Sequence, residues 1–254
     1  TAKKIICNDK EPHLLGLLEY LKNTPYTEIT ESVMAVINKY NLSISSRNGY
    51  EYYGCNSSMG LGTYNKKYFM NLRNHFNMLS KEDENYFPEL YTLIIFSFNN
   101  QIRFNTDGKY NLPVGKRDFN LKMIDKLYDF TVHSSKLLFL NKDFSEILPK
   151  TLTSQDFVYA DPPYLITCAT YNEKSWNVNE EKRLLEYLDE LTAHKIRFAL
   201  SNVLSTDNKT NLILQDWLTT HKNYVCHHLN FSYRNSNYHK KNKAKTDEVL
   251  ITNY

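Results

Sequence analysis

Residues 157–164 read FVYADPPY, an apolar run of four residues followed by an acidic, proline-rich loop. The run at 157–160 predicts a short buried strand that ends at a turn signal. Two consecutive prolines fix φ near about −65° and remove two N–H donors, so a rigid row of carbonyl acceptors follows the strand. The stretch therefore predicts an α/β fold in which a functional loop emerges from the end of a strand.

The acidic residue beside the two prolines suits a planar amine as the reacting group. An exocyclic amino group has two hydrogens to donate, and the Asp161 carboxylate and the Pro162 carbonyl can accept both. Pro163 stiffens the loop, and Tyr164 offers a flat face to a ring. This arrangement would direct the nitrogen lone pair at an electrophile. The alternative is a strand-terminating turn in which Asp161 is an ordinary turn residue.

The composition is that of a globular protein with a sizeable core. The chain has 254 residues, of which 41% are hydrophobic, enough for one or two domains. The four cysteines, at positions 7, 55, 168 and 226, form no CxxC pair, so we expect neither a zinc site nor a disulfide framework. No apolar stretch is long enough for a membrane span and no signal peptide is evident. We expect a soluble, cytoplasmic protein with no metal and no membrane partner.

The positive charge is uneven along the chain. The net charge is only +3, yet a basic cluster lies near the C-terminus and contains Arg234, His239, Lys240, Lys241, Lys243 and Lys245. Such a cluster could meet nucleic-acid phosphates. A solvated surface loop is the alternative, because basic runs with Asn and Ser are common in connectors.

Predicted strands and helices alternate over much of the chain. Strands are expected at 3–7, 136–140, 157–160, 196–201, 224–229 and 248–252, and helices at 11–22, 27–40, 65–79, 85–98, 179–193 and 208–221. Such alternation implies a largely parallel sheet that binds ligands at the carboxyl ends of its strands. Asp9, Asp143 and Asp161 all follow strands, where an acidic residue commonly accepts the ribose hydroxyls of a nucleoside cofactor.

A hairpin is predicted in the middle of the chain. Asp107-Gly108 lies between two alternating runs, at 101–106 and 109–113. Arg and Asn side chains make bidentate contacts to guanine and adenine edges, so we consider this hairpin a DNA reader. The candidate contact residues are Arg103, Asn105, Asn111, Pro113, Lys116 and Arg117. A polar edge hairpin that contacts nothing is the alternative.

Taken together, these residues resemble the Dam-type, or D12-class, DNA adenine methyltransferases over nearly the whole chain. The resemblance rests on four stretches that occur in the family's order: 98–105 with Pro113 and 115–117, 141–144, 161–164 and 246–249. It implies a Rossmann-like, S-adenosylmethionine-dependent methyltransferase sheet with an inserted, mostly helical target-recognition domain that carries a β-hairpin. The catalytic domain would comprise 1–40 and 134–254, and the recognition domain 41–133, with the hairpin at 101–117.

The resemblance also implies roles for individual residues. The family transfers a methyl group from S-adenosylmethionine to the exocyclic amine of an adenine flipped out of double-stranded DNA. Asp161 and the Pro162 carbonyl would hold the amine, and Tyr164 would stack on the base. Asp9 would bind the cofactor ribose, and Asp143 the amino group of the cofactor adenine, with the Phe144 backbone beside it; Asp161 also faces the cofactor. No metal is required.

The expected target sequence is GATC. Arg103, Asn105 and Arg117 fall where the family's hairpin meets its site. A restriction endonuclease of the same system is the one protein partner that we consider, and no stable protein partner is implied.

One departure from the family pattern concerns the N-terminus. Family members begin with a strand and a glycine-rich cofactor loop, and neither is present before the strand at 3–7. Gly60-Leu61-Gly62 follows no predicted strand and does not replace that loop. Without the strand, sheet edges would be exposed. We expect that the native protein has a further N-terminal segment.

Two other functions stay open at the level of sequence. The first is a naturally shortened, inactive relative that binds DNA without a cofactor. The second is methylation of an exocyclic amine in RNA, which the hairpin disfavours because it suits a duplex groove.

Overall fold

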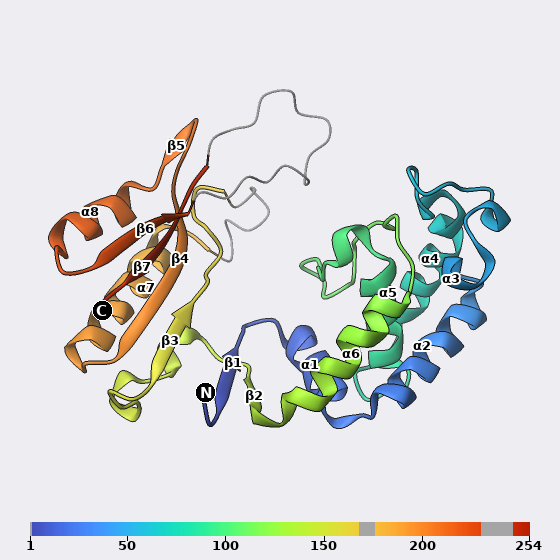
Figure 1. Cartoon of the computed structure of the whole chain (residues 1–254), viewed down its shortest axis with the longest axis horizontal. Coiled ribbons are helices and arrows are strands. Elements are labelled where there is room, and N and C mark those ends of the chain that lie inside the picture. Colours follow the sequence, from blue (N-terminus) through green and yellow to red (C-terminus); the bar gives the residue numbers. More distant parts are fainter. Residues whose placement is uncertain (1, 168–175, 230–245) are drawn as a thin grey trace. The chain divides into compact units, whose positions relative to one another are not determined.

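The computed structural model describes residues 2–167, 176–229 and 246–254. The chain forms two compact units, residues 1–142 and 143–254 (Figure 1). The basic cluster predicted to meet phosphates lies outside the described residues. None of the described helices is long and apolar enough to cross a bilayer. The division of the chain into a catalytic and a recognition domain stays a prediction.

The first unit begins and ends with paired strands. β1 (Ile5–Asn8) lies parallel to β2 (Leu137–Leu140), with Ile5 opposite Leu137. The Asn8 side chain links the carboxyl ends of the two strands. Its Nδ2 donates to the Lys142 carbonyl at 3.0 Å, and its Oδ1 accepts from the Lys142 N–H at 3.1 Å. The loops that follow the two strands therefore leave the sheet together.

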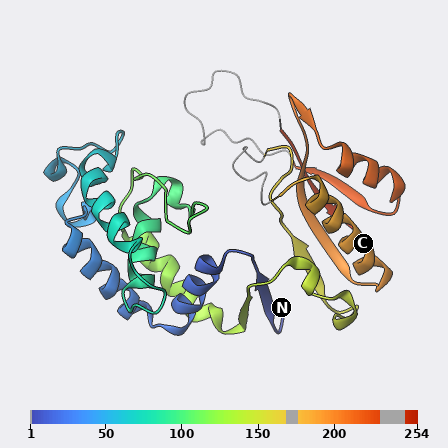
Figure 2. The same cartoon turned by 180° about the vertical axis from the view of Figure 1, so that it is seen from behind.

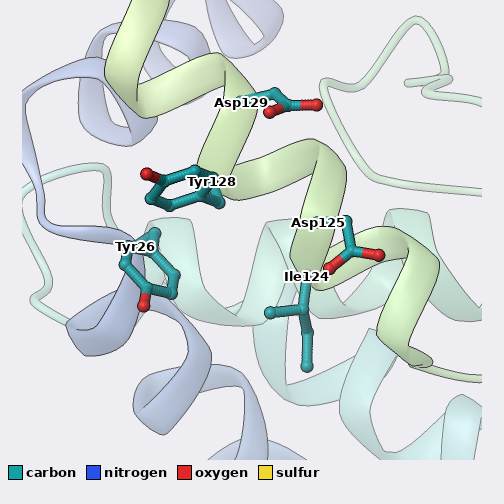
Figure 3. A pocket seen from close by; sticks show the side chains of 5 residues that line it. All are labelled: Tyr26, Ile124, Asp125, Tyr128 and Asp129. Carbon is teal, nitrogen blue, oxygen red and sulfur yellow. The ribbon is translucent and has the colours of Figure 1, made fainter.

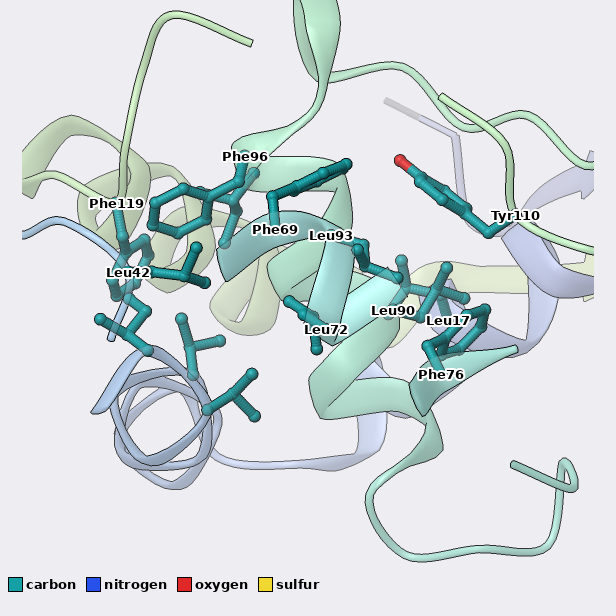
Figure 4. Close-up of a cluster of buried hydrophobic side chains, with 14 of the residues drawn as sticks. Leu17, Leu42, Phe69, Leu72, Phe76, Leu90, Leu93, Phe96, Tyr110 and Phe119 are labelled. Atoms are coloured by element: carbon teal, nitrogen blue, oxygen red, sulfur yellow. The ribbon is translucent and has the colours of Figure 1, made fainter. Parts of the chain in front are cut away.

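Between these strands the first unit is helical. Its helices are α1 (Pro12–Asn23), α2 (Tyr26–Tyr40), α3 (Ser45–Asn48), α4 (Gly62–Phe76), α5 (Tyr86–Phe96) and α6 (Leu121–His133), with 3₁₀ turns at Glu51–Tyr53, Phe98–Asn100 and Ser134–Lys136. The apolar α5 lies at the centre and packs against α1, α2 and α4. Figure 4 shows its Leu90, Leu93 and Phe96 among Phe69 and Leu72 of α4, all of them buried. This core supports the loops on either side of α5.

The second unit is a mixed sheet covered by helices. Its strands are β3 (Phe157–Ala160), β4 (Arg197–Thr206), β5 (Lys209–Thr210), β6 (Val225–Leu229) and β7 (Thr246–Thr252), in the order β3-β4-β7-β6 with β5 paired to β4. β3 and β4 are parallel, and the other pairs are antiparallel. The helices α7 (Val178–Ala193) and α8 (Leu212–Thr220) pack against β4 (Figure 2). Short 3₁₀ turns lie at Phe144–Glu146 and Pro149–Thr151.

Within the described residues, β1 pairs with β2 in the first unit, and β3 to β7 form the sheet of the second unit. The β1–β2 sheet ends at β1, whose Ile5 and Ile6 are each 45% exposed. The larger sheet ends at β3, whose Phe157 and Tyr159 are 50% and 58% exposed. Apolar edge strands are unusual, because an unpaired edge is open to further strands. β1 and β3 are therefore apolar strands at an edge of the sheet to which each belongs.

Three glycines fix the turn that carries Lys116. The Leu61 N–H donates to the Lys116 carbonyl at 2.9 Å. A Cβ on Gly60 would lie 2.6 Å from the Lys116 Cβ, and one on Gly62 would lie 2.9 Å from the Gly115 carbonyl oxygen. A Cβ on Gly115 would overlap the carbonyl oxygen of Ser97. The Gly60-Leu61-Gly62 segment therefore supports a tight backbone crossing, which explains its glycines without a cofactor.

We expect Gly115→Ala to lower the free energy of unfolding by about 1–3 kcal/mol, because the new methyl group overpacks a backbone contact that has no side chain to move aside. Urea unfolding measures the effect. Lys116→Ala is the matched control, since Lys116 is exposed and its truncation should change stability by less than about 0.5 kcal/mol. Equal stabilities of the two variants would contradict the crossing.

Candidate active site and DNA-reading loop

The Asp161 loop closes on itself and is tied to the neighbouring strand. Asp161 is exposed at the carboxyl end of β3, and Tyr164 is half-buried. The Tyr164 hydroxyl donates to Asp161 Oδ1 at 3.0 Å and lies 3.1 Å from Ser201 Oγ in β4. Burial raises the pKa of Tyr164, so the phenol stays protonated. Because a phenol has a single hydrogen, Ser201 must donate to Tyr164 while Tyr164 donates to Asp161.

Ser201 is a site residue that the sequence predictions missed. It lies one residue beyond Leu200, which is the parallel partner of Ala160, just as Asp161 lies one residue beyond Ala160. Strand register therefore brings Ser201 beside the loop. The only sequence signal is a hydroxyl within an apolar strand. The hydrogen bonds from Ser201 to Tyr164 and from Tyr164 to Asp161 therefore orient the Asp161 carboxylate.

Asp143 and Phe144 are held by a guanidinium that the sequence analysis also missed. Asp143 caps the 3₁₀ turn, and its Oδ1 accepts from the Ser145 N–H at 3.0 Å. Arg183 of α7 donates to the same oxygen at 3.0 Å and lies 5.2 Å from the Phe144 ring centroid. Glu180 braces Arg183 through two bonds of 2.7 Å. One cation thus contacts two of the predicted cofactor residues, Asp143 and Phe144.

Asp9 follows β1 in the first unit. Its N–H donates to the Leu140 carbonyl at 3.1 Å, and its Oδ1 accepts from the Glu11 N–H at 2.7 Å. The Asn141 side chain donates to the Asp9 carbonyl at 2.9 Å. These three hydrogen bonds hold Asp9 in a fixed turn between β1 and α1, at the strand end where the sequence predicts it.

The predicted hairpin is shorter than expected. Within 101–113 the structure has one isolated bridge, between Phe104 and Tyr110, and no longer ladder. The side-chain oxygen of Asn105 accepts from the N–H groups of Asp107, at 3.1 Å, and Lys109, at 2.8 Å. Asn105 therefore holds the turn, and its oxygen is engaged within the loop. Backbone hydrogen bonds join the two limbs on either side of the bridge, from the Asn105 N–H to the Lys109 carbonyl at 2.9 Å and from the Asn111 N–H to the Arg103 carbonyl at 3.2 Å.

Two other candidate reading residues contact each other across the loop. Arg103 Nε donates to Asn111 Oδ1 at 2.7 Å, and a second guanidinium nitrogen donates to the Asn111 carbonyl at 3.3 Å. Both Arg103 bonds are made on the exposed side of the loop. The Pro113 carbonyl accepts from the Phe98 N–H at 2.9 Å. The structure thus brings Arg103 and Asn111 together and anchors the limb at Pro113.

Lys116 and Arg117 form an exposed turn between two anchored residues. Gly115 lies in the tight crossing described above, and Asp118 is buried. The Asp118 carboxylate accepts from the hydroxyls of Ser43, at 3.1 Å, and Ser45, at 2.9 Å. Burial raises the pKa of Asp118. The two cationic side chains therefore project from a rigid backbone.

A buried carboxylate organises the start of α7. Glu181 is fully buried, and Trp176 Nε1 donates to its Oε2 at 2.8 Å. The side-chain amides of Asn202 and Asn211 donate to its Oε1 at 3.1 and 2.9 Å. The Glu181 carboxylate thus links Trp176 to Asn202 of β4 and to Asn211, the N-cap of α8.

A pocket on the first unit is lined by none of the predicted site residues. It has a volume of about 470 Å³ and is lined by Tyr26, Ile124, Asp125, Tyr128 and Asp129 (Figure 3). The two carboxylates make this pocket unsuitable for a phosphate.

Glu181→Leu should lower the free energy of unfolding by at least about 2 kcal/mol, because it leaves three buried donors without an acceptor and each costs about 1–3 kcal/mol. Urea unfolding followed by tryptophan fluorescence measures the loss. Glu186→Leu is the control, since Glu186 is exposed on the same helix. A loss in the Glu181 variant no larger than in the control would show that this carboxylate does not organise the unit.

Known proteins resemble the chain over its full length. The family model for the D12 class of N6 adenine-specific DNA methyltransferases matches residues 1–227. The chain is 35% identical to the type II methyltransferase M.FokI of Planomicrobium okeanokoites and 34% identical to the modification methylase StsI of Streptococcus sanguinis, and each alignment covers 100% of the chain and 36% of the relative. It is 25% identical to the DNA adenine methylase of Salmonella typhimurium over 42% of the chain and 40% of that protein.

The chain spans about a third of the length of the first two relatives, at 36% of each. The family match covers most of the chain, from residue 1 to residue 227. The chain therefore belongs to the D12 class of N6 adenine-specific DNA methyltransferases.

Proposed function

We propose that the protein transfers a methyl group from S-adenosylmethionine to the exocyclic N6 amine of adenine in double-stranded DNA. The observation that carries this proposal is the Asp161-Pro162-Pro163-Tyr164 loop at the end of β3, in which the Tyr164 hydroxyl orients the Asp161 carboxylate at 3.0 Å. Membership of the D12 class supplies the reaction that such a loop would perform.

Asp161 and Pro162 orient the amine. The carboxylate and the carbonyl accept its two hydrogens, so that the nitrogen lone pair faces the methyl group. S-adenosylmethionine supplies an electrophilic methyl group. Positive charge develops on the nitrogen as it attacks, and the Asp161 carboxylate stabilises that charge before the proton leaves to solvent. The protein therefore needs alignment more than a strong base.

Tyr164 receives the base. Extraction of a nucleotide from the duplex costs a few kcal/mol of stacking and pairing, which contacts in the pocket must offset. The aromatic ring of Tyr164 would stack on the adenine, and its bond to Ser201 would hold the ring in place. The hydroxyl bond to Asp161 would couple base stacking to the orientation of the carboxylate.

Asp9, Asp143 and Phe144 are the proposed cofactor contacts. Asp9 would accept the ribose hydroxyls, Asp143 would accept from the adenine amino group, and the Phe144 backbone would lie beside the ring. Asp9 directly follows β1 and Asp143 comes three residues after the end of its parallel partner β2, which supports this assignment. Arg183 supports it further, because its contact at 3.0 Å restricts the Asp143 carboxylate.

The proposed DNA contacts are Arg103, Asn105, Asn111, Pro113, Lys116 and Arg117, with GATC as the candidate target. The exposure of Lys116 and Arg117 on an anchored turn supports their role in reading bases. Two relatives that align with the whole chain are a type II methyltransferase and a modification methylase. We therefore place the protein in a restriction-modification system, as the enzyme that protects sites from an endonuclease.

Asp161→Ala should abolish methyl transfer while leaving duplex affinity within about twofold, because phosphate contacts lie elsewhere and supply most of the affinity. Tritiated methyl transfer to duplex oligonucleotides, with parallel binding measurements, checks both. Asp216→Ala is the control, since Asp216 is exposed on α8 and should keep full activity. Turnover retained by the Asp161 variant would refute the assignment.

Arg117→Ala should reduce discrimination at one base pair by about 1–3 kcal/mol, the worth of a bidentate contact to a base edge. The measurement is transfer to a set of duplexes that carry GATC and each of its single-base changes. Lys109→Ala is the control, because Lys109 lies exposed at the turn and is not a proposed reader. Discrimination that stays the same at all four positions would remove Arg117 from the reading set.

A further inference from the structure

Helix α4 carries an exposed polar stripe. Residues spaced three and four apart form one face of the helix, and they line an open surface pocket of about 430 Å³: Thr63, Lys66, Lys67, Met70, Asn71 and Asn74. The sequence of α4 includes no acidic residue. We call these six residues the α4 stripe. Thr63 and the two lysines lie in the half of the stripe nearer the N-terminus of the helix, and the two asparagines lie in the half nearer its C-terminus.

The proposed reading loop, residues 101–117, lies along one flank of this stripe. Asn77 exchanges two hydrogen bonds with the Tyr110 backbone, at 3.1 and 2.8 Å, and Arg73 donates to the Leu112 carbonyl at 3.0 Å. Lys66, Met70, Arg73 and Asn77 follow one another at i, i+4, i+7 and i+11, so they share a helix face. The limb from 110 to 116 therefore runs antiparallel to α4, beside the stripe.

The lysines of the stripe lie near the turn that carries Lys116 and Arg117. That turn is bonded to the start of α4, because the Leu61 N–H donates to the Lys116 carbonyl at 2.9 Å. Lys66 and Lys67 are four and five residues from Gly62, which corresponds to about 6–8 Å along the helix axis. The major groove is about 12 Å wide, so phosphates that flank a base read by Arg117 come within reach of these lysines.

The charge pattern of α4 differs from that of α6. Exposed lysines alone indicate only a solvated face, and α6 has two, Lys122 and Lys126. On α6 they are interleaved with Asp125 and Asp129, which would repel a phosphate. On α4 the lysines adjoin amide and hydroxyl side chains, which donate hydrogen bonds to phosphate oxygens.

We propose that the α4 stripe binds the phosphate backbone of duplex DNA beside the bases that the 116–117 turn reads. This inference rests on the proposed function, and it adds a surface outside the predicted reading residues. Contacts of this kind set the register of a protein on DNA and carry no sequence information. The stripe therefore contributes affinity and salt dependence, and the reading loop contributes discrimination.

The test is duplex binding as a function of salt concentration, with Lys66→Gln and Lys67→Gln combined in one variant. Each phosphate contact contributes a slope of about 0.9 to a plot of log affinity against log salt. Between 50 and 200 mM salt, the affinity of the unmodified protein should therefore fall by a factor about ten times larger than that of the variant, which lacks two contacts. The ratio of affinities for GATC and unrelated duplexes should stay unchanged. The matched control combines Lys122→Gln and Lys126→Gln, and it should keep the original slope.

Three outcomes overturn the inference. An unchanged slope in the α4 variant, or an equal change in the α6 control, removes the stripe from the interface while leaving the proposed function intact. A changed affinity ratio would assign the lysines to base reading instead. An unmodified protein that fails to bind duplex DNA overturns both this inference and the proposed function. Because all four lysines are exposed, the melting temperatures of both variants should match that of the unmodified protein.

Discussion

Parallel pairing of strands is the constraint on which the candidate active site depends. In a parallel pair both strands end at the same edge, so the loops that follow them emerge together. The pairing of Ala160 with Leu200 brings Asp161 and Ser201 to the same level, and Tyr164 then bridges them with bonds of 3.0 and 3.1 Å. The pairing of β1 with β2 does the same for the loops that begin at Asp9 and Asn141. The positions of the acidic loops at the strand ends therefore follow from strand register.

The proposed reading loop depends on a different constraint, which is the close approach of backbones in the helical unit. Gly62 and Gly115 allow contacts that any Cβ would prevent, and the limb that precedes the turn at Lys116 and Arg117 is bonded along α4. Asp118 fixes the far side of the turn through Ser43 and Ser45. A loop with little regular pairing of its own thus becomes rigid through its neighbours. Rigidity of this kind is what base recognition requires, because a mobile cation would contact phosphates and bases alike.

Local sequence patterns predicted the elements well and the long-range contacts poorly. Apolar periodicity located β3, α7 and β6 within one or two residues, and the Asp-Pro-Pro-Tyr loop follows β3 as expected. Ser201 and Arg183 were missed because they reach their partners across 37 and 40 residues, and periodicity carries no information about such contacts. The predicted hairpin is present in a short form, with one bridge between Phe104 and Tyr110, and the Asn105 side chain holds its turn, a contact that an Asp-Gly signal does not reveal. Helix α6 was also absent from the predictions, although Asn120 caps it.

The most direct test of the central claim is to identify the methylated nucleoside. Duplex DNA incubated with the protein and S-adenosylmethionine would be digested to nucleosides and analysed by mass spectrometry. We predict N6-methyl-2′-deoxyadenosine, confined to duplexes that contain the target sequence. Methylated cytosine or guanine, or no methylated adenine from a protein that binds both DNA and the methyl donor, would contradict it.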